Sequence, residues 1–107
     1  EINNAAKFWL ELGVNGFRVD AIQHITETDG NIRNTPETFV WLKSFQAFIK
    51  TVNPEAFLVG ETWTDTQAIV RYHEDANLDM SFNYPLWGVL LEAIQKRSVT
   101  DLAFLLE

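Results

Sequence analysis

The chain has 107 residues, of which 47% are hydrophobic and 21% are charged, and its formal net charge is −7. An aromatic content of 13% is too high for a disordered chain, and no apolar run approaches the roughly 20 residues that a membrane-spanning helix needs. The eight Lys and Arg residues are scattered, which argues against a nucleic-acid-binding surface. The absence of cysteine excludes disulfides and thiolate chemistry but leaves the compartment open between extracellular and cytoplasmic.

The first half of the chain predicts two helices on either side of a buried strand. Apolar residues recur at helical spacing over residues 1–12, and Gly13 is a natural residue to end that helix. The short apolar run 16–22 predicts a buried parallel strand. After a polar loop over 26–34, a Thr-Pro-Glu start predicts a helix over 35–52.

The second half continues the same alternation. In order, it predicts a buried strand over 56–61, a helix over 66–73 capped by Asp65, a strand over 78–84 closed by Pro85, a helix over 86–96, and a further helix over 102–106 that a capping box at Ser98 and Asp101 begins. The chain opens inside one helix and stops one turn into another. We therefore expect a segment of a longer protein.

Strict alternation of helices and strands predicts a parallel sheet joined by right-handed crossovers. A doubly wound nucleotide-binding sheet would carry a glycine-rich turn, and neither G-x-G-x-x-G nor a P-loop occurs. Instead, Asp20 and Glu61 close successive predicted strands, which is where (β/α)8 barrels place catalytic side chains. We predict an α/β fold in which residues 1–107 are part of one catalytic (β/α)8 barrel domain.

Asp20 and Glu61 also have the residue types of a glycosidase pair. Neighbouring strands lie roughly 4.8 Å apart, and two carboxyl groups roughly 5 Å apart suit a retaining mechanism. Arg18, two residues before Asp20, is expected to keep it ionised as a nucleophile, whereas an apolar setting near Trp63 is expected to raise the pKa of Glu61 and make it the acid. The same spacing also fits a purely structural Arg18–Asp20 ion pair with Glu61 in solvent.

Two stretches resemble known sequence blocks. Residues 16–25, Gly-Phe-Arg-Val-Asp-Ala-Ile-Gln-His-Ile, are similar to the second conserved block of the α-amylase superfamily (glycoside hydrolase family 13), and residues 59–63, Val-Gly-Glu-Thr-Trp, are similar to the third. Residues 79–87 resemble the sixth strand and its following helix. The resemblance implies a piece of the barrel from about the third helix to beyond the sixth strand.

The resemblance also implies roles for three residues. Asp20 would be the nucleophile, Glu61 the general acid and base, and Arg18 the residue that orients Asp20. The blocks that hold the family's third catalytic carboxylate are absent, and none of the other Asp residues matches them. The chemistry would need no cofactor, and no residue is assigned as a metal ligand, although the full-length protein could hold a structural calcium ion.

Three residues are candidates for substrate binding. His24 would lie near the acceptor side of the cleft, and its backbone carbonyl is a calcium ligand in calcium-binding members. Gln23 stands where many α-amylases have Lys, and Trp63 is the best candidate to stack on a sugar. Trp9 and Trp41 fall on or beside apolar helical stripes and are expected to pack between helix and barrel.

The expected activity is α-amylase-like hydrolysis of α-1,4 links in α-glucans through a covalent glycosyl-Asp intermediate, absent from the isolated segment. Within the same superfamily, the alternatives are an exo-acting α-glucosidase or a cyclomaltodextrinase. A non-catalytic carbohydrate-binding relative is the alternative from another class. The expected partner is an α-glucan oligo- or polysaccharide.

Overall fold

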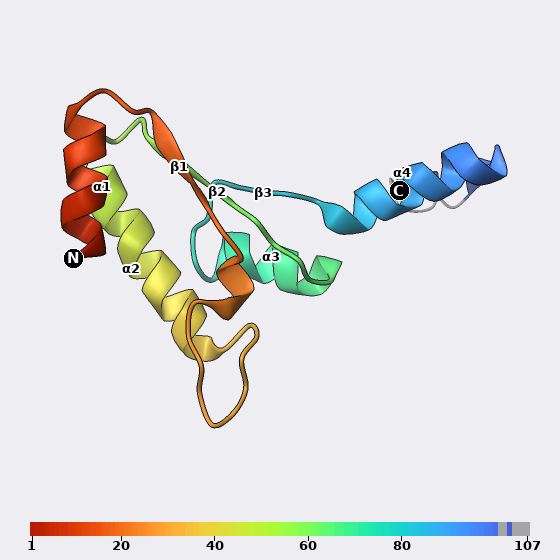
Figure 1. The fold of residues 1–107 in the computed structure, drawn as a ribbon, viewed down its shortest axis with the longest axis horizontal. Coiled ribbons are helices and arrows are strands. Elements are labelled where there is room, and N and C mark those ends of the chain that lie inside the picture. The colour runs from red at the N-terminus through yellow and green to blue at the C-terminus, as the bar shows by residue number, and fades with distance from the viewer. Residues whose placement is uncertain (101–102, 104–107) are drawn as a thin grey trace.

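The computed structural model describes residues 1–100 and 103. Helices and strands alternate along the chain (Figure 1). In order they are α1 (Ile2–Glu11), β1 (Gly16–Val19), the short 3-10 helix η1 (Ile22–His24), α2 (Pro36–Val52), β2 (Phe57–Gly60), α3 (Thr66–Glu74), β3 (Met80–Ser81) and α4 (Tyr84–Lys96). Within the described residues the strands form one parallel sheet in the order β1-β2-β3, which confirms the predicted topology.

The register of β1 and β2 places the ends of both strands together. Val19 lies opposite Gly60, and the ladder continues one step further, where the Glu61 N–H donates to the Val19 carbonyl at 2.9 Å. The Ile22 N–H then donates to the Glu61 carbonyl at 3.3 Å. Asp20 and Glu61 therefore leave the sheet at the same edge.

Helix starts follow the capping residues that the sequence predicts. Thr35 is fully buried, and its hydroxyl accepts from the Thr38 N–H at 3.3 Å at the start of α2. The Asp65 carboxylate accepts from the Ala68 N–H at 2.9 Å at the start of α3. These caps fix where both crossover helices begin relative to the strands.

All three strands are shorter than predicted, and β2 (Phe57–Gly60) loses one residue at each end of the expected 56–61. The strand expected over 16–22 ends at Val19, because Ala21 adopts a left-handed conformation (φ 42°, ψ 47°) that turns the chain into η1. The strand expected over 78–84 keeps only Met80–Ser81. Just before β3, the Asp79 carboxylate accepts a hydrogen bond from the Leu58 N–H of β2 at 2.8 Å, in place of a backbone carbonyl of a neighbouring strand.

The end of the third strand is also earlier than predicted. Asn83 caps α4 by accepting from the Leu86 N–H at 3.0 Å, so the helix begins at Tyr84 and Pro85 lies inside its first turn. Pro85 therefore helps to start a helix rather than to close a strand. The further helix expected over 102–106 lies, except for Ala103, outside the described residues.

The core lies where α1, α2 and α3 pack against the sheet. Its buried apolar members are Ala6, Leu10, Ile22, Phe39, Leu42, Phe45, Ile49, Ala56, Leu58, Tyr72, Ala76 and Leu78. Trp41 packs against this core as predicted, but Trp9 is half exposed, so its expected burial is wrong. None of the helices in the described residues is both long and apolar enough to cross a bilayer.

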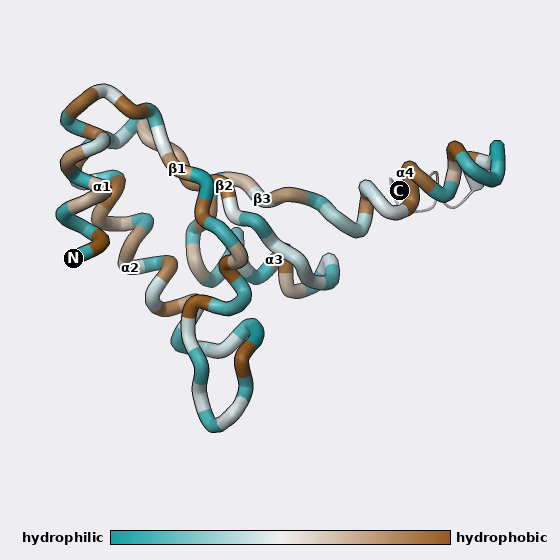
Figure 2. Tube along the Cα trace, viewed as in Figure 1, coloured by the Kyte–Doolittle hydropathy of each residue, from teal (hydrophilic) through white to brown (hydrophobic). Residues whose placement is uncertain are grey.

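Helix α4 extends away from this body and has no buried residue (Figures 1 and 2). The Cα radius of gyration is 16.2 Å, against about 13 Å for a compact chain of this length. Large apolar side chains along and after α4 are exposed, namely Trp87, Leu90, Leu91, Ile94 and Val99. This helix presents an apolar surface without a partner in the described chain.

Candidate active site

One guanidinium joins the two strand-end carboxylates. Arg18 on β1 contacts Asp20 through Nη1–Oδ1 at 2.8 Å and Glu61 through Nη2–Oε1 at 2.9 Å. The predicted Arg18–Asp20 pair is confirmed, and both acids contact the same guanidinium. The second contact, from Arg18 to Glu61, was not predicted, and it makes the three residues one charged cluster.

Glu61 is held far more tightly than Asp20. Its Oε1 accepts hydrogen bonds from Trp63 Nε1 and the Tyr84 hydroxyl, both at 3.1 Å, and its Oε2 accepts from the Ala21 N–H at 3.1 Å. The Glu61 side chain is 15% exposed, whereas that of Asp20 is 76% exposed. Asp20 is therefore the open carboxylate of the pair and Glu61 the enclosed one.

This environment lowers the pKa of Glu61 to about 2. The hydrogen bond from Trp63 and then that from the Ala21 N–H are the main causes, opposed by desolvation and supported by Tyr84 and Arg18. The expectation that a less polar setting raises the pKa of Glu61 is therefore wrong for this site. Trp63 does lie beside Glu61, but it acts on the carboxylate through its N–H group rather than as an apolar wall.

Arg18 stays fully charged in this cluster. Desolvation acts to lower its pKa, but hydrogen bonds and charges from Asp20 and Glu61 outweigh this and raise it above the ordinary value. The guanidinium carbon lies 5.9 Å from the centroid of the Phe82 ring. Arg18 is thus a permanent cation between the two acids, with an aromatic ring on one side.

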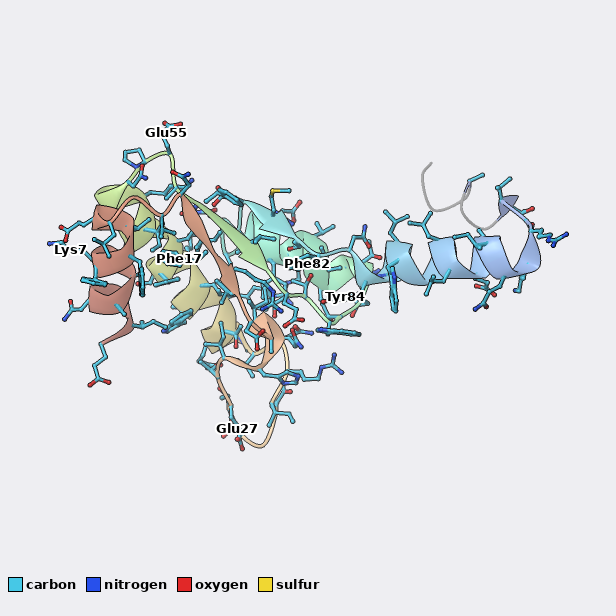
Figure 3. The ribbon with its side chains drawn as sticks, turned by 45° about the horizontal axis from the view of Figure 1, so that its top comes forward. Lys7, Phe17, Glu27, Glu55, Phe82 and Tyr84 are labelled. Carbon is cyan, nitrogen blue, oxygen red and sulfur yellow. The ribbon has the colours of Figure 1, made fainter. Side chains whose placement is uncertain are left out.

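Trp63 and Tyr84 form a stacked pair beside Glu61, with ring centroids 3.9 Å apart and an interplanar angle of 19°. Figure 3 shows Tyr84 and Phe82 where the sheet meets the start of α4. The rings of Trp63 and Tyr84 also border an open pocket of about 610 Å³, whose wall includes Arg33 and Asp65. Trp63 is half exposed, so the part of its ring that Tyr84 does not cover is accessible to a ligand.

The loop before α2 braces the segment that carries Trp63. The Arg33 guanidinium donates to the Trp63 carbonyl, and Asn34 Nδ2 donates to the Thr64 hydroxyl at 3.0 Å. Asn34 in turn accepts from the Tyr72 hydroxyl at 2.7 Å, and burial raises the pKa of Tyr72 to about 12. These contacts hold the segment after β2 in a defined position.

The other two candidates for substrate binding, His24 and Gln23, differ in their exposure to solvent. His24 is exposed, and its Nδ1–H donates to the Ile32 carbonyl at 2.6 Å, which fixes the ring. Gln23 is only 2% exposed, and its Oε1 has no hydrogen-bond partner among the described residues. This burial does not support the predicted contact of Gln23 with a sugar, because η1 turns its side chain away from solvent.

The possible calcium ion of the full-length protein stays a prediction. Within residues 1–100 and 103, no three His, Asp or Glu side chains come together as a potential metal site. Calcium takes 6–8 oxygen ligands, which include backbone carbonyls and water as well as carboxylates.

Tyr84 is the site residue that the sequence did not reveal. It was expected inside a strand, yet as the first residue of α4 it reaches Glu61, 23 positions earlier. The available signal was the resemblance of residues 79–87 to a barrel strand, because the carboxyl end of such a strand faces the same site. A tyrosine at that end is a candidate hydrogen-bond donor.

Comparisons with known proteins identify the family of the chain. The family model described as "Alpha amylase, catalytic domain" matches residues 1–105. Alpha-amylase 3 of Dictyoglomus thermophilum is 35% identical over 94 residues, which cover 88% of this chain and 17% of that protein. Trehalose synthase/amylase TreS of Mycobacterium tuberculosis is 33% identical over 98 residues, which cover 86% of this chain and 16% of that protein.

The fold is similar to that of a solved α-amylase structure. The crystal structure of an α-amylase from H. orenii matches with a TM-score of 0.69 and 29% identity, over 86% of this chain and 18% of that chain. The chain thus spans less than a fifth of the length of each of these proteins. The chain belongs to the α-amylase family, and its parallel α/β fold is a partial (β/α)8 barrel.

Proposed function

We propose that this chain is the central part of a retaining glycoside hydrolase that cleaves α-1,4 links in α-glucans. The observation that carries the proposal is the bridging of Asp20 and Glu61 by Arg18 at the ends of paired parallel strands. A retaining pair is separated by only about 5 Å, and one guanidinium between the two acids keeps them close. The membership in the α-amylase family supports the same chemistry.

Each residue has a defined role in this proposal. The Asp20 carboxylate, which is open to solvent, attacks the anomeric carbon and forms a glycosyl ester as the glycosidic bond breaks. Glu61 gives its proton to the departing oxygen, then takes a proton from the water that hydrolyses the ester. Arg18 keeps Asp20 ionised and oriented.

The low pKa of Glu61 adds a condition to this cycle. In the free site Glu61 is ionised at neutral pH, whereas an acid must carry a proton before the bond breaks. Substrate binding must therefore loosen the contact of Glu61 with Arg18 or Trp63, or remove water from around the carboxylate. Either change favours the neutral form.

Transfer to a sugar is the second candidate function. Two relatives carry the names trehalose synthase/amylase and cyclomaltodextrin glucanotransferase. The same glycosyl ester on Asp20 would be attacked by a sugar hydroxyl instead of water. Product analysis after incubation with maltoheptaose distinguishes shorter oligosaccharides alone from longer, cyclic or rearranged products.

The stereochemistry of the product tests the proposed mechanism. In a complete catalytic domain that carries this chain, proton NMR during maltoheptaose cleavage is expected to show the α-anomer first, before mutarotation. Initial release of the β-anomer would refute the glycosyl ester on Asp20. Absence of any cleavage of maltoheptaose and starch by that domain would instead favour the non-catalytic relative.

A further inference from the structure

Two donors from different elements meet at one oxygen of Glu61. Trp63 Nε1, from the segment after β2, and the Tyr84 hydroxyl, from the first turn of α4, both lie 3.1 Å from Oε1. Arg18 Nη2 contacts the same oxygen at 2.9 Å. Oε2, in contrast, accepts only the Ala21 N–H among the described contacts, at 3.1 Å.

We infer that Tyr84 is a positioning residue for Glu61. Together with Trp63, Tyr84 holds Oε1 of Glu61, and Oε2 is then the oxygen that carries the exchangeable proton. Three donors saturate Oε1, because a carboxylate oxygen accepts about two hydrogen bonds at full strength. A proton added to Oε1 would face these donors, whereas Oε2 has a lone pair that none of the described contacts occupies. The catalytic consequence of this inference rests on the proposed function.

The Tyr84 hydroxyl is built to act as a donor. Its pKa is raised by desolvation, then by the hydrogen bond to Glu61 and the charge of that carboxylate, so it keeps its proton across the neutral range. The Asn83 cap fixes the start of α4, and the ring stacks on Trp63 at 3.9 Å. Both contacts hold the ring without using the hydroxyl, which is then free to serve Glu61.

Removing the hydroxyl alone separates positioning from packing. Tyr84→Phe keeps the ring on Trp63 but deletes one donor to the carboxylate. In a complete catalytic domain with ¹³C-labelled Glu, the carboxyl resonance of Glu61 is followed against pH, and its pKa is expected to rise by about half a unit or more. This readout does not require activity.

A matched control is Tyr72→Phe, the same change at the other tyrosine of the chain. The Tyr72 hydroxyl donates to Asn34 and does not contact Glu61. Because Tyr72 acts on Glu61 only indirectly, through Asn34 and the segment that carries Trp63, this variant is expected to change the pKa of Glu61 less than Tyr84→Phe does. Trp63→Phe, which removes the Nε1–H but keeps an aromatic ring, is expected to raise it as Tyr84→Phe does.

The pH profile of kcat for maltoheptaose, which reports the pKa values of groups in the enzyme–substrate complex, completes the test. If Glu61 is the general acid, its pKa sets the alkaline limb, and Tyr84→Phe moves that limb to higher pH. Movement of the acidic limb instead would support positioning by Tyr84 but assign Glu61 as the base or nucleophile. An unchanged Glu61 pKa with unchanged limbs overturns the inference. A shifted pKa in an inactive wild-type domain supports the inference and refutes the proposed function.

Discussion

Val19 lies opposite Gly60 in the parallel ladder, and this one pair determines the position of the candidate active site. The next residue on each strand is an acid, so Asp20 and Glu61 leave the sheet side by side. A slip of one residue would turn the side chains of one strand to the other face of the sheet. The register of β1 against β2 is therefore a condition for the catalytic pair.

Gly16 holds that register at the other end of the same strands. A Cβ atom built on Gly16 would lie 2.1 Å from the Phe57 carbonyl oxygen, which is backbone and cannot move aside alone. We expect Gly16→Ala to lower the free energy of unfolding of a complete catalytic domain by about 1–3 kcal/mol. Urea titration followed by circular dichroism measures this change.

Gly88→Ala is the control for that substitution. Gly88 lies in α4, and a Cβ there would meet nothing within 4 Å in the described chain. In a helix interior, alanine is favoured over glycine by roughly 0.5–1 kcal/mol, so this variant is expected to be at least as stable as the wild type. Equal effects of the two substitutions would show that Gly16 does not fix the register.

Much of the site follows from local sequence pattern. Two short apolar runs that each end in an acid predict neighbouring buried strands, and the structure places Asp20 and Glu61 together accordingly. Arg18 lies two residues before Asp20, so the side-chain period of a strand puts both on one face. The predicted ion pair between Arg18 and Asp20 forms, with Nη1 of Arg18 at 2.8 Å from Oδ1 of Asp20.

The protonation state of Glu61 could not be predicted from the local sequence pattern. Its neighbours Leu58, Val59 and Gly60 are apolar, which favours a raised pKa, but the donors come from a turn and from a distant helix. The Ala21 N–H is available only because Ala21 is left-handed, and Tyr84 reaches Glu61 only because α4 starts early. The left-handed conformation of Ala21 has no signal in the local sequence, and the helix-start signal of Asn83 and Pro85 was outweighed by the apolar pattern that predicts a strand over 78–84.

Replacement of the nucleophile tests the proposed roles directly. Asp20→Asn keeps the size of the side chain but cannot form the glycosyl ester, so starch hydrolysis by a complete catalytic domain is expected to fall on the order of 10³–10⁴-fold or more. Because Asp20 is 76% exposed, the thermal unfolding midpoint is expected to change little. Initial rates near those of the wild type would refute the assignment.

Residues 1–107 alone are expected to show no starch hydrolysis. Asp20 is open to solvent, and α4 buries none of its residues, so this segment does not enclose a substrate. The exposed apolar side chains of α1 and α4 should also promote self-association. Reducing-sugar release and light scattering measure the two effects, and hydrolysis by the monomeric segment would contradict the expectation.

Asp79 gives the fold an acid-sensitive contact away from the catalytic pair. Its Oδ2 accepts from the Leu58 N–H at 2.8 Å, and its Oδ1 pairs with Lys50 Nζ at 3.2 Å, so it joins β2, β3 and α2. Burial acts to raise the pKa of Asp79, but these contacts lower it below the ordinary value. Asp79 therefore stabilises the fold above its unfolded-state pKa of about 3.9 and loses this effect as the pH falls through the folded value.

Asp79→Asn tests this contribution in a complete catalytic domain. At pH 7 we expect a loss of about 1 kcal/mol, because the ion pair with Lys50 disappears while the amide oxygen can still accept from Leu58. Below pH 4 the difference from the wild type should shrink, since Asp79 is then becoming neutral in both states of the wild type. Asp75→Asn, which removes an exposed pair with Arg71, is the control with a smaller cost. Urea unfolding between pH 3 and 7 measures both, and a constant difference for Asp79→Asn across that range would contradict the assignment.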